Sequence, residues 1–189
     1  NATPADAFIL YQQITTRTLL RDSSIDMAPI SFRAQDLDTP AAADQLTLEL
    51  KANDIELLGN GKRFAIATKA GASLPSLPNY DHLVNHATPT GSARVGAGEI
   101  NFPRIALEPF LDFYAELTGR TLLRPSTLPN VDLSLQTETE LNLHQAIYAL
   151  DMLMALNGVK STFLGERFVL ITAQDHDTSR FPQPPAKAA

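Results

Sequence analysis

In the second half of the chain, apolar residues recur at the spacing of two amphipathic helices. The first predicted helix opens at Pro109, a proline suited to a first helical turn, and ends at Gly119. The second begins after Asn142 and stops at Asn157-Gly158, where glycine tolerates the left-handed backbone of a helix end. The apolar stripe of this second helix comprises Leu143, Ala146, Ile147, Leu150, Leu153 and Met154.

Strand-like segments surround these two helices. Residues 131–137 alternate apolar and polar side chains, which indicates a strand with one buried face. A short strand at 99–102 precedes the first helix and is closed by Pro103. Residues 120–124 form a strand after that helix, and a hairpin through Gly165 closes the unit. The predicted order is β-α-β-β-α-β-β.

The first half of the chain repeats this pattern. Residues 16–25, TRTLLRDSSI, recur 103 positions later as residues 119–128, GRTLLRPSTL. The shift becomes 104 further along, and the correspondence then joins about residues 4–68 to about residues 107–172. An internal repeat of this length predicts one module written twice. In each copy the decapeptide is expected to hold a helix end and a core strand whose two leucines lie under the helices.

The helices of the first copy are marked by their own start signals. Thr3-Pro4 with Asp6 is typical of a capped helix start, and Phe8, Tyr11 and Ile14 form the buried stripe. Thr39-Pro40 opens the second helix, whose inward residues are Ala43, Leu46 and Leu50.

Three positions of the first copy differ from the pattern of the second. Asp54 stands where the second copy has Gly158, and Asp tolerates the left-handed region better than most residues. Thr16 replaces Gly119, so its helix is expected to end by other means and less regularly. The strand matching 99–102 would precede residue 1. We therefore expect the parent protein to continue upstream, with the first module cut or lacking its first strand.

These patterns predict an α+β protein made of two tandem βαββαβ-type modules, each with two helices packed on a small mixed sheet. The first module covers 1–70 and the second covers 99–173. Residues 71–98 lack periodicity and are predicted to be a linker, long enough to let the modules reorient. Residues 174–189 are a Pro-rich tail or a further linker.

Composition narrows the classes of function. The chain has 189 residues, 44% of them hydrophobic and 19% charged, with a formal charge of −6. An acidic chain does not attract nucleic acid by long-range electrostatics. No apolar run is long enough to span a membrane, so direct insertion of this fragment is not expected. Cysteine is absent, which excludes disulfides and thiolate metal sites.

Few residues suggest chemistry. Asp81, His82 and His86 could place two imidazoles on one helical face, but a polar linker is the more frequent origin of such a pattern. The segment Asp175-His176-Asp177 lies in the tail, where nothing holds ligands in place. His144 falls in the first turn of the second helix and is expected at the surface. No nucleophile has a base placed by the sequence, so we expect no enzyme, no metal and no cofactor.

Two helices on a three-stranded sheet also describe the KH nucleic-acid module. That module grips the nucleic-acid backbone with a G-x-x-G loop. No two glycines of this chain lie three apart, and the chain is acidic. Both observations disfavour a KH module.

The second copy resembles the N-terminal periplasmic modules of bacterial secretins, the outer-membrane ring proteins of type II secretion and type IV pilus systems. The resemblance is carried by the segments NFP (101–103), TGRTLL (118–123), VDLSL (131–135), LHQAIYALDMLMALNGV (143–159) and GERFVLIT (165–172). The first copy matches more loosely. The chain contains no membrane-barrel region, so an alternative is an envelope protein that borrows the module, such as the signalling domain of some TonB-dependent receptors.

The resemblance implies a non-enzymatic periplasmic role in a protein anchored in the outer membrane. It implies self-association into a ring and docking of an inner-membrane secretion component or of secreted cargo. From the residues alone, a sheet covered on one face leaves its other face and its edges free to associate. We expect the edges to be the strand from Ile100 to Phe102 and the closing strand from Arg167 to Ile171. The candidate interface residues are Ile100, Asn101, Phe102, Arg167, Val169 and Ile171.

Overall fold

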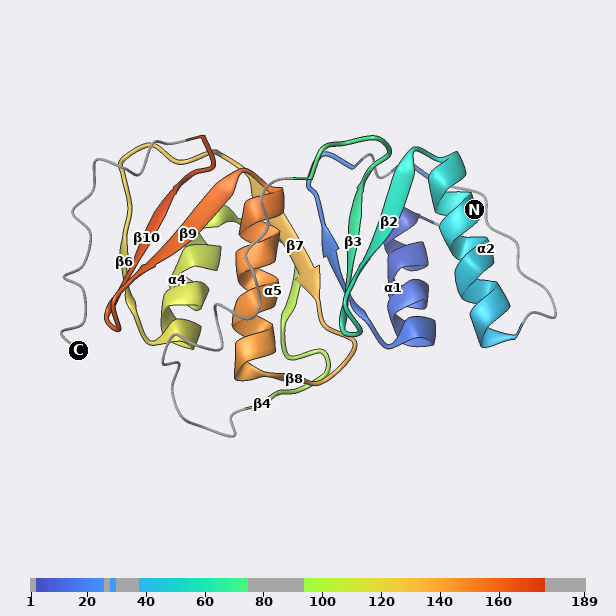
Figure 1. The fold of residues 1–189 in the computed structure, drawn as a ribbon, viewed down its shortest axis with the longest axis horizontal. Coiled ribbons are helices and arrows are strands. Elements are labelled where there is room, and N and C mark those ends of the chain that lie inside the picture. The colour runs from blue at the N-terminus through green and yellow to red at the C-terminus, as the bar shows by residue number, and fades with distance from the viewer. Residues whose placement is uncertain (1–2, 26–27, 30–37, 75–93, 176–189) are drawn as a thin grey trace.

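The fold is α+β and is built from two copies of a small module, as the sequence predicts. The structure is a computed structural model, and it describes residues 3–25, 28–29, 38–74 and 94–175. Two helices and a three-stranded sheet recur in each module (Figure 1). The helices of the described residues are α1 (Pro4–Thr15), α2 (Thr39–Ala52), α4 (Leu107–Thr118) and α5 (Leu143–Leu156).

Side-chain caps explain where three of these helices begin. Thr3 caps α1 in a reciprocal capping box with Asp6, as predicted. Asp38 caps α2 through the backbone N–H of Ala41. Asn142 and Gln145 form a second capping box at α5. Helix α4 begins two residues before the predicted Pro109 and has no side-chain cap.

Within the described residues, the strands form two three-stranded sheets and two small ribbons. The first sheet has the order β1-β3-β2 and the second has the order β6-β10-β9. In each sheet the central strand pairs parallel with one neighbour and antiparallel with the other. The strands are β1 (Thr18–Arg21), β2 (Ile55–Asn60), β3 (Phe64–Lys69), β4 (Arg94–Val95), β5 (Asn101–Ala106), β6 (Thr121–Leu123), β7 (Asp132–Gln136), β8 (Leu141–Asn142), β9 (Val159–Leu164) and β10 (Phe168–Ala173).

Two ribbons of the second module depart from the predicted single sheet. Among the residues that the structure describes, β5 and β7 pair only with each other, and β4 pairs with β8. The prediction that Pro103 closes its strand is wrong. Strand β5 continues to Ala106 because the register shifts between Phe102 and Ile105, and an irregularity of this kind accommodates a proline. Strand β4 lies inside the predicted linker 71–98, so paired structure begins before residue 99.

The two modules pack against each other, in contrast to the expected reorienting pair. Helices α1 and α2 cover one face of the first sheet, and α5 and β7 lie on its other side (Figure 1). The Leu20, Phe64 and Ile66 side chains of the first sheet belong to the same hydrophobic core as α4 and α5. Along the long axis of Figure 1, α1 and α2 are followed by the first sheet, then by β7 with α4 and α5, and then by the second sheet. The modules therefore share one continuous core.

Two residues adopt the left-handed backbone that glycine provides in the second module. Thr16 has φ 55° and ends α1 as Gly119, with φ 63°, ends α4. The prediction that Thr16 ends its helix by other means is wrong. Asp54, with φ 64°, matches Gly158 as expected. The repeated backbone thus imposes a strained conformation on two residues that carry a Cβ.

The repeated decapeptide lies as predicted at a helix end followed by a strand, but its two leucines point to opposite faces. Leu19 packs with the core under α1 and α2, whereas Leu20 packs with the core of the second module. Adjacent residues of a strand alternate between faces, so both leucines cannot lie under the same helices. The expectation of a Leu-Leu pair under the helices is corrected accordingly.

Candidate interaction surfaces

The junction between the modules is the best-defined interaction surface of the described residues. The Tyr148 ring of α5 lies against the Phe64 ring of β3, with ring centroids 5.3 Å apart. Leu20 and Ile66 are almost completely buried beside them. Burying one such side chain contributes about 1.5–3 kcal/mol, so this helix-on-sheet contact is a substantial part of the stability.

Hydrogen bonds fix the register of this contact. The Asn60 side-chain amide donates to the Tyr148 hydroxyl at 2.9 Å. Asn157, at the end of α5, accepts from the backbone N–H of Ser23 at 2.8 Å. The Arg21 guanidinium donates to the Ser134 hydroxyl of β7 at 2.5 Å. Directional bonds at both ends of α5 select one orientation of the helix on the sheet.

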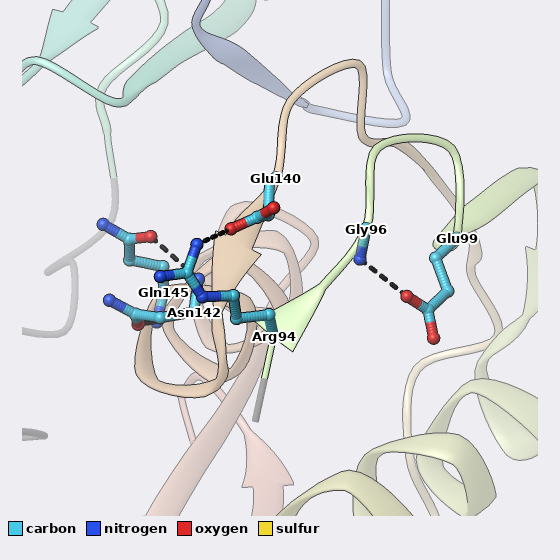
Figure 2. Close-up of polar contacts among 6 residues, drawn as sticks. All are labelled: Arg94, Gly96, Glu99, Glu140, Asn142 and Gln145. Carbon is cyan, nitrogen blue, oxygen red and sulfur yellow. Dashed lines mark hydrogen bonds and ion pairs between the residues drawn. The ribbon is translucent and has the colours of Figure 1, made fainter. Parts of the chain in front are cut away.

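A polar clasp holds the start of α5. Strand β4 pairs with β8 directly before the helix, and Arg94 forms an ion pair with Glu140 (Figure 2). Figure 2 also shows Glu99 accepting from the backbone N–H of Gly96, at 2.6 Å, in the turn after β4. The chain that enters the second module is thereby tied to the N-terminus of its buried helix.

A buried carboxyl group stands in the middle of α5. One oxygen of Asp151 accepts hydrogen bonds from the Tyr114 hydroxyl at 2.7 Å and the Ser161 hydroxyl at 2.6 Å. Its other oxygen, Oδ2, is buried without a hydrogen-bond partner. Burial raises the pKa of Asp151 to about 6, although the two hydrogen bonds favour the ionised form. Burial and the neighbouring Asp151 also raise the pKa of Tyr114 well above its usual range.

These three groups do not form a reactive site. Asp151 and Tyr114 are enclosed by the core, so no substrate reaches them. Nucleophilic or acid–base catalysis needs a group within reach of the reacting atoms. The cluster instead joins α4, α5 and β9 through one polar centre.

The candidate interface residues are divided between core and surface. Ile100, Val169 and Ile171 are buried in the core of the second module. Asn101 and Arg167 are exposed. Phe102 is half-buried, with its ring against that of Phe113. The buried three are therefore not available to a partner as side chains.

The expectation that residues 167–171 form an edge strand is wrong. Strand β10 pairs with β6 on one side and with β9 on the other, so it is central. The alternating pattern of a strand gives its faces but not its neighbours, which long-range contacts select. The ribbon strand β5, by contrast, pairs on one side only within the part of the chain that the structure describes.

The predicted free face of the sheet is the outward face of the second sheet, but the candidate interface residues do not include the side chains that lie on it. Paired registers place the Leu123, Phe168 and Leu164 side chains on this face, away from α4 and α5. Leu123 is 40% exposed and Phe168 is 41% exposed, which is unusual for large apolar side chains in a sheet. Further along the same face, Leu170 is buried. We call Leu123, Leu164 and Phe168 the open face.

The apolar composition of α5 is the feature of the sequence that could have predicted the junction between the modules. Apart from Asp151, its residues from Ala146 to Leu156 are apolar, and all of them are buried. A helix with apolar residues all around is buried on all sides. Helix α2 has only Leu46 and Leu50 fully buried, as in an ordinary amphipathic helix. The stripe read from the sequence thus identified only the face of α5 that meets its own sheet.

Metal and catalytic candidates gain no support where the structure describes them. In the described residues, no group of three His, Asp or Glu side chains is arranged to hold a metal ion. Asp81, His82 and His86 lie outside the described residues, as do His176 and Asp177. His144 is half-buried at the start of α5.

A polar cleft of about 550 Å³ lies beside the module junction. Arg21, Arg104 and Asp132 are among its lining residues. Arg104 is paired with Asp132 at 2.5 Å, and Arg21 is bonded to Ser134. The Asp132 carboxylate therefore compensates the charge of Arg104, while Arg21 is held by a neutral hydroxyl.

Comparison with known proteins assigns no relative. No protein-family profile matches the chain, and no curated protein or solved structure matches it with significance. Within the ranges that the structure describes, none of the helices is long and apolar enough to cross a membrane.

Proposed function

We propose that this chain is a non-catalytic assembly region of a secretin-like outer-membrane protein, working in the periplasm in protein secretion or pilus assembly. It would contribute to a ring of subunits and dock an inner-membrane secretion component or secreted cargo. Neither nucleic acid nor a cofactor takes part in this role. The secretin and periplasmic parts of the proposal rest on the resemblance of the second module.

One observation carries the assembly role. The first sheet buries its apolar outer face against α5, while the corresponding face of the second sheet leaves Leu123 and Phe168 exposed. Exposed apolar side chains that gather on one sheet face are typical of protein–protein contacts. A module that already binds a helix on this face has the surface chemistry to bind another.

The alternative is the signalling domain of a TonB-dependent receptor or another envelope interaction module. Copy number separates the two roles, because a signalling domain is expected as a single module. Here two copies share one core through Leu20, Phe64 and Ile66. This fused pair favours a repeated assembly unit over a single signalling domain.

Sedimentation equilibrium of the chain tests the assembly role. Modules that rely on a ring for avidity associate weakly in isolation. The average mass should therefore rise reversibly with concentration up to about 1 mM. A chain that stays monomeric over this whole range, under conditions where it is folded, would overturn the proposal.

A further inference from the structure

The outer faces of the two sheets correspond residue by residue. Leu20 of β1 corresponds to Leu123 of β6, and Phe64 of β3 corresponds to Phe168 of β10. In the first module both side chains are buried against the second module. In the second module the same positions are about 40% exposed. The same sheet face is therefore buried in the first module and exposed in the second.

Helix α5 and strand β7 together cover the first sheet. Helix α5 has a counterpart in the first module, because the shift of 104 residues places α2 at its position, with C-caps Asn157 and Asn53 in matching conformations. Met152 of α5 lies one turn beyond Tyr148 on the same face and is buried. Its counterpart in α2 is Leu48, which is 62% exposed.

We propose that the open face of the second module binds α2 of a second copy of this chain, head to tail. Leu48 of one chain would take the place beside Leu123 and Phe168 that α5 takes beside Leu20 and Phe64. Leu48, Leu123 and Phe168 are three of the four exposed large apolar side chains in the described residues. The fourth, Leu10, lies on α1, and we place it outside this contact because its counterpart Phe113 packs on Phe102 of β5.

Polar groups at the two ends of the contact also correspond. Asp44 takes the position of Tyr148, and Arg167 takes that of Arg63 beside it, so opposite charges would face each other. Asn53 corresponds to Asn157, which accepts from the backbone N–H of Ser23. Its partner in a second chain would be the corresponding N–H of Ser126. Asp44, Arg167 and Ser126 are all exposed and free to meet a partner surface.

The order of layers makes this contact a head-to-tail one. Helices α1 and α2 lie at one end of the long axis, and β6-β10-β9 lies at the other (Figure 1). Joining these ends continues the alternation of helix and sheet layers from one chain into the next. Such a heterologous contact closes into a ring or extends as a filament, depending on its rotation. The inference deepens the assembly role proposed above and rests on it.

Disulfide trapping between two single-cysteine variants tests the contact directly. The chain has no cysteine, so Leu48→Cys and Leu123→Cys carry one thiol each. Mixed and oxidised mildly, they should give a mixed dimer in excess over either homodimer, because only opposite ends meet. A mixture of Leu10→Cys with Leu123→Cys is the matched control, since Leu10 has an exposure similar to that of Leu123.

Three results would overturn the inference. The first is a mixed dimer that is no more abundant than in the control mixture. The second is a dominant Leu48→Cys homodimer, which would indicate a symmetric contact between two α2 helices. The third is a dominant Leu123→Cys homodimer, which would indicate pairing of two second sheets. If one of these results is found while the mass of the unmodified chain still rises with concentration, the chain self-associates through another surface, and the assembly role is retained. A chain that is monomeric throughout removes both proposals.

A charged variant gives an independent measurement. Leu48→Asp places a carboxylate at the centre of the proposed contact and should weaken self-association about tenfold or more in sedimentation equilibrium. Leu10→Asp should leave it unchanged. Because both positions are exposed in one chain, neither variant removes a core contact of the fold. Equal association of the two variants contradicts the inference.

Discussion

The two modules use the same sheet in different ways, and one pair of leucines shows the difference. Leu20 and Leu123 occupy the same place in the repeated decapeptide and the same place in their sheets. Leu20 is completely buried by the second module, whereas Leu123 remains 40% exposed. Local sequence therefore fixes which face a residue occupies, while the neighbour of that face decides whether the residue is core or surface.

The helix positions differ in the same way. Asp151 of α5 corresponds to Thr47 of α2, whose hydroxyl donates to the Ala43 carbonyl in its own helix. Phe113 of α4 packs its ring against Phe102 of β5, at 5.1 Å. Its counterpart Leu10 has no equivalent of β5 to pack on in the described residues and is exposed. At Leu10 and Phe113 the copies differ because the second module has a neighbouring strand that the described residues of the first lack.

The largest expected effect comes from truncating the two equivalent leucines. Leu20→Ala should lower the free energy of unfolding by about 2–5 kcal/mol, because it leaves a cavity in the shared core. Leu123→Ala should lower it by less than about 1 kcal/mol, because the side chain is half in solvent. Urea denaturation of both variants measures the difference. Equal losses would show that the modules do not share a core.

A smaller effect is expected at the buried carboxyl group that only the second module has. The folded pKa of Asp151, about 6, lies above its ordinary value of 3.8. Folding thus favours the protonated carboxyl group. The contribution of Asp151 to the free energy of unfolding is therefore fully present below about pH 4 and is lost as the pH rises through about 6. Asp151→Asn keeps an acceptor for Tyr114 and Ser161 without a charge. It should be more stable than the natural chain at pH 7, by up to about 3 kcal/mol.

Thermal unfolding between pH 4 and pH 8 measures this effect. The natural chain should lose stability across the interval relative to Asp151→Asn, and the two curves should converge below pH 4. Asp112→Asn, on the exposed side of α4, is the matched control and should follow the natural chain. A constant difference between Asp151→Asn and the natural chain at all pH values would falsify the ionisation of Asp151 as the cause.

The smallest effect is expected at the two equivalent helix ends. Thr16→Gly relieves a left-handed backbone on an exposed residue and should raise stability by about 1 kcal/mol. Gly119→Ala should lower it by a similar amount, about 1 kcal/mol. An added Cβ at Gly119 meets nothing within 4 Å, so conformation alone sets this cost. Chemical denaturation measures the change in the free energy of unfolding of each variant. Changes of opposite sign support the same left-handed backbone at both helix ends, and changes of the same sign contradict it.

The sequence determined the repeat, the type of each element and most helix ends. Thr3 and Asp6 indicate a capped helix start, and Gly119 and Gly158 indicate helix ends, because caps and left-handed residues depend on local chemistry. The β7 alternation likewise predicted its buried face. In each case the signal and the structure lie within a few residues of each other.

Only the tertiary structure decided which strand is central, what covers each sheet and whether a leucine is exposed. The hydrophobic period of β10 is the same for a central strand as for an edge strand, and it gave the wrong answer. Leu20 and Leu123 lie in nearly identical local sequence yet differ in burial. The reason is that helix α5, more than 100 residues after Leu20 in the chain, packs on the face that holds Leu20, and no such helix covers Leu123 within the described residues. Strand pairing and helix docking depend on contacts between segments that are distant in the sequence, and a local hydrophobic pattern does not determine these contacts.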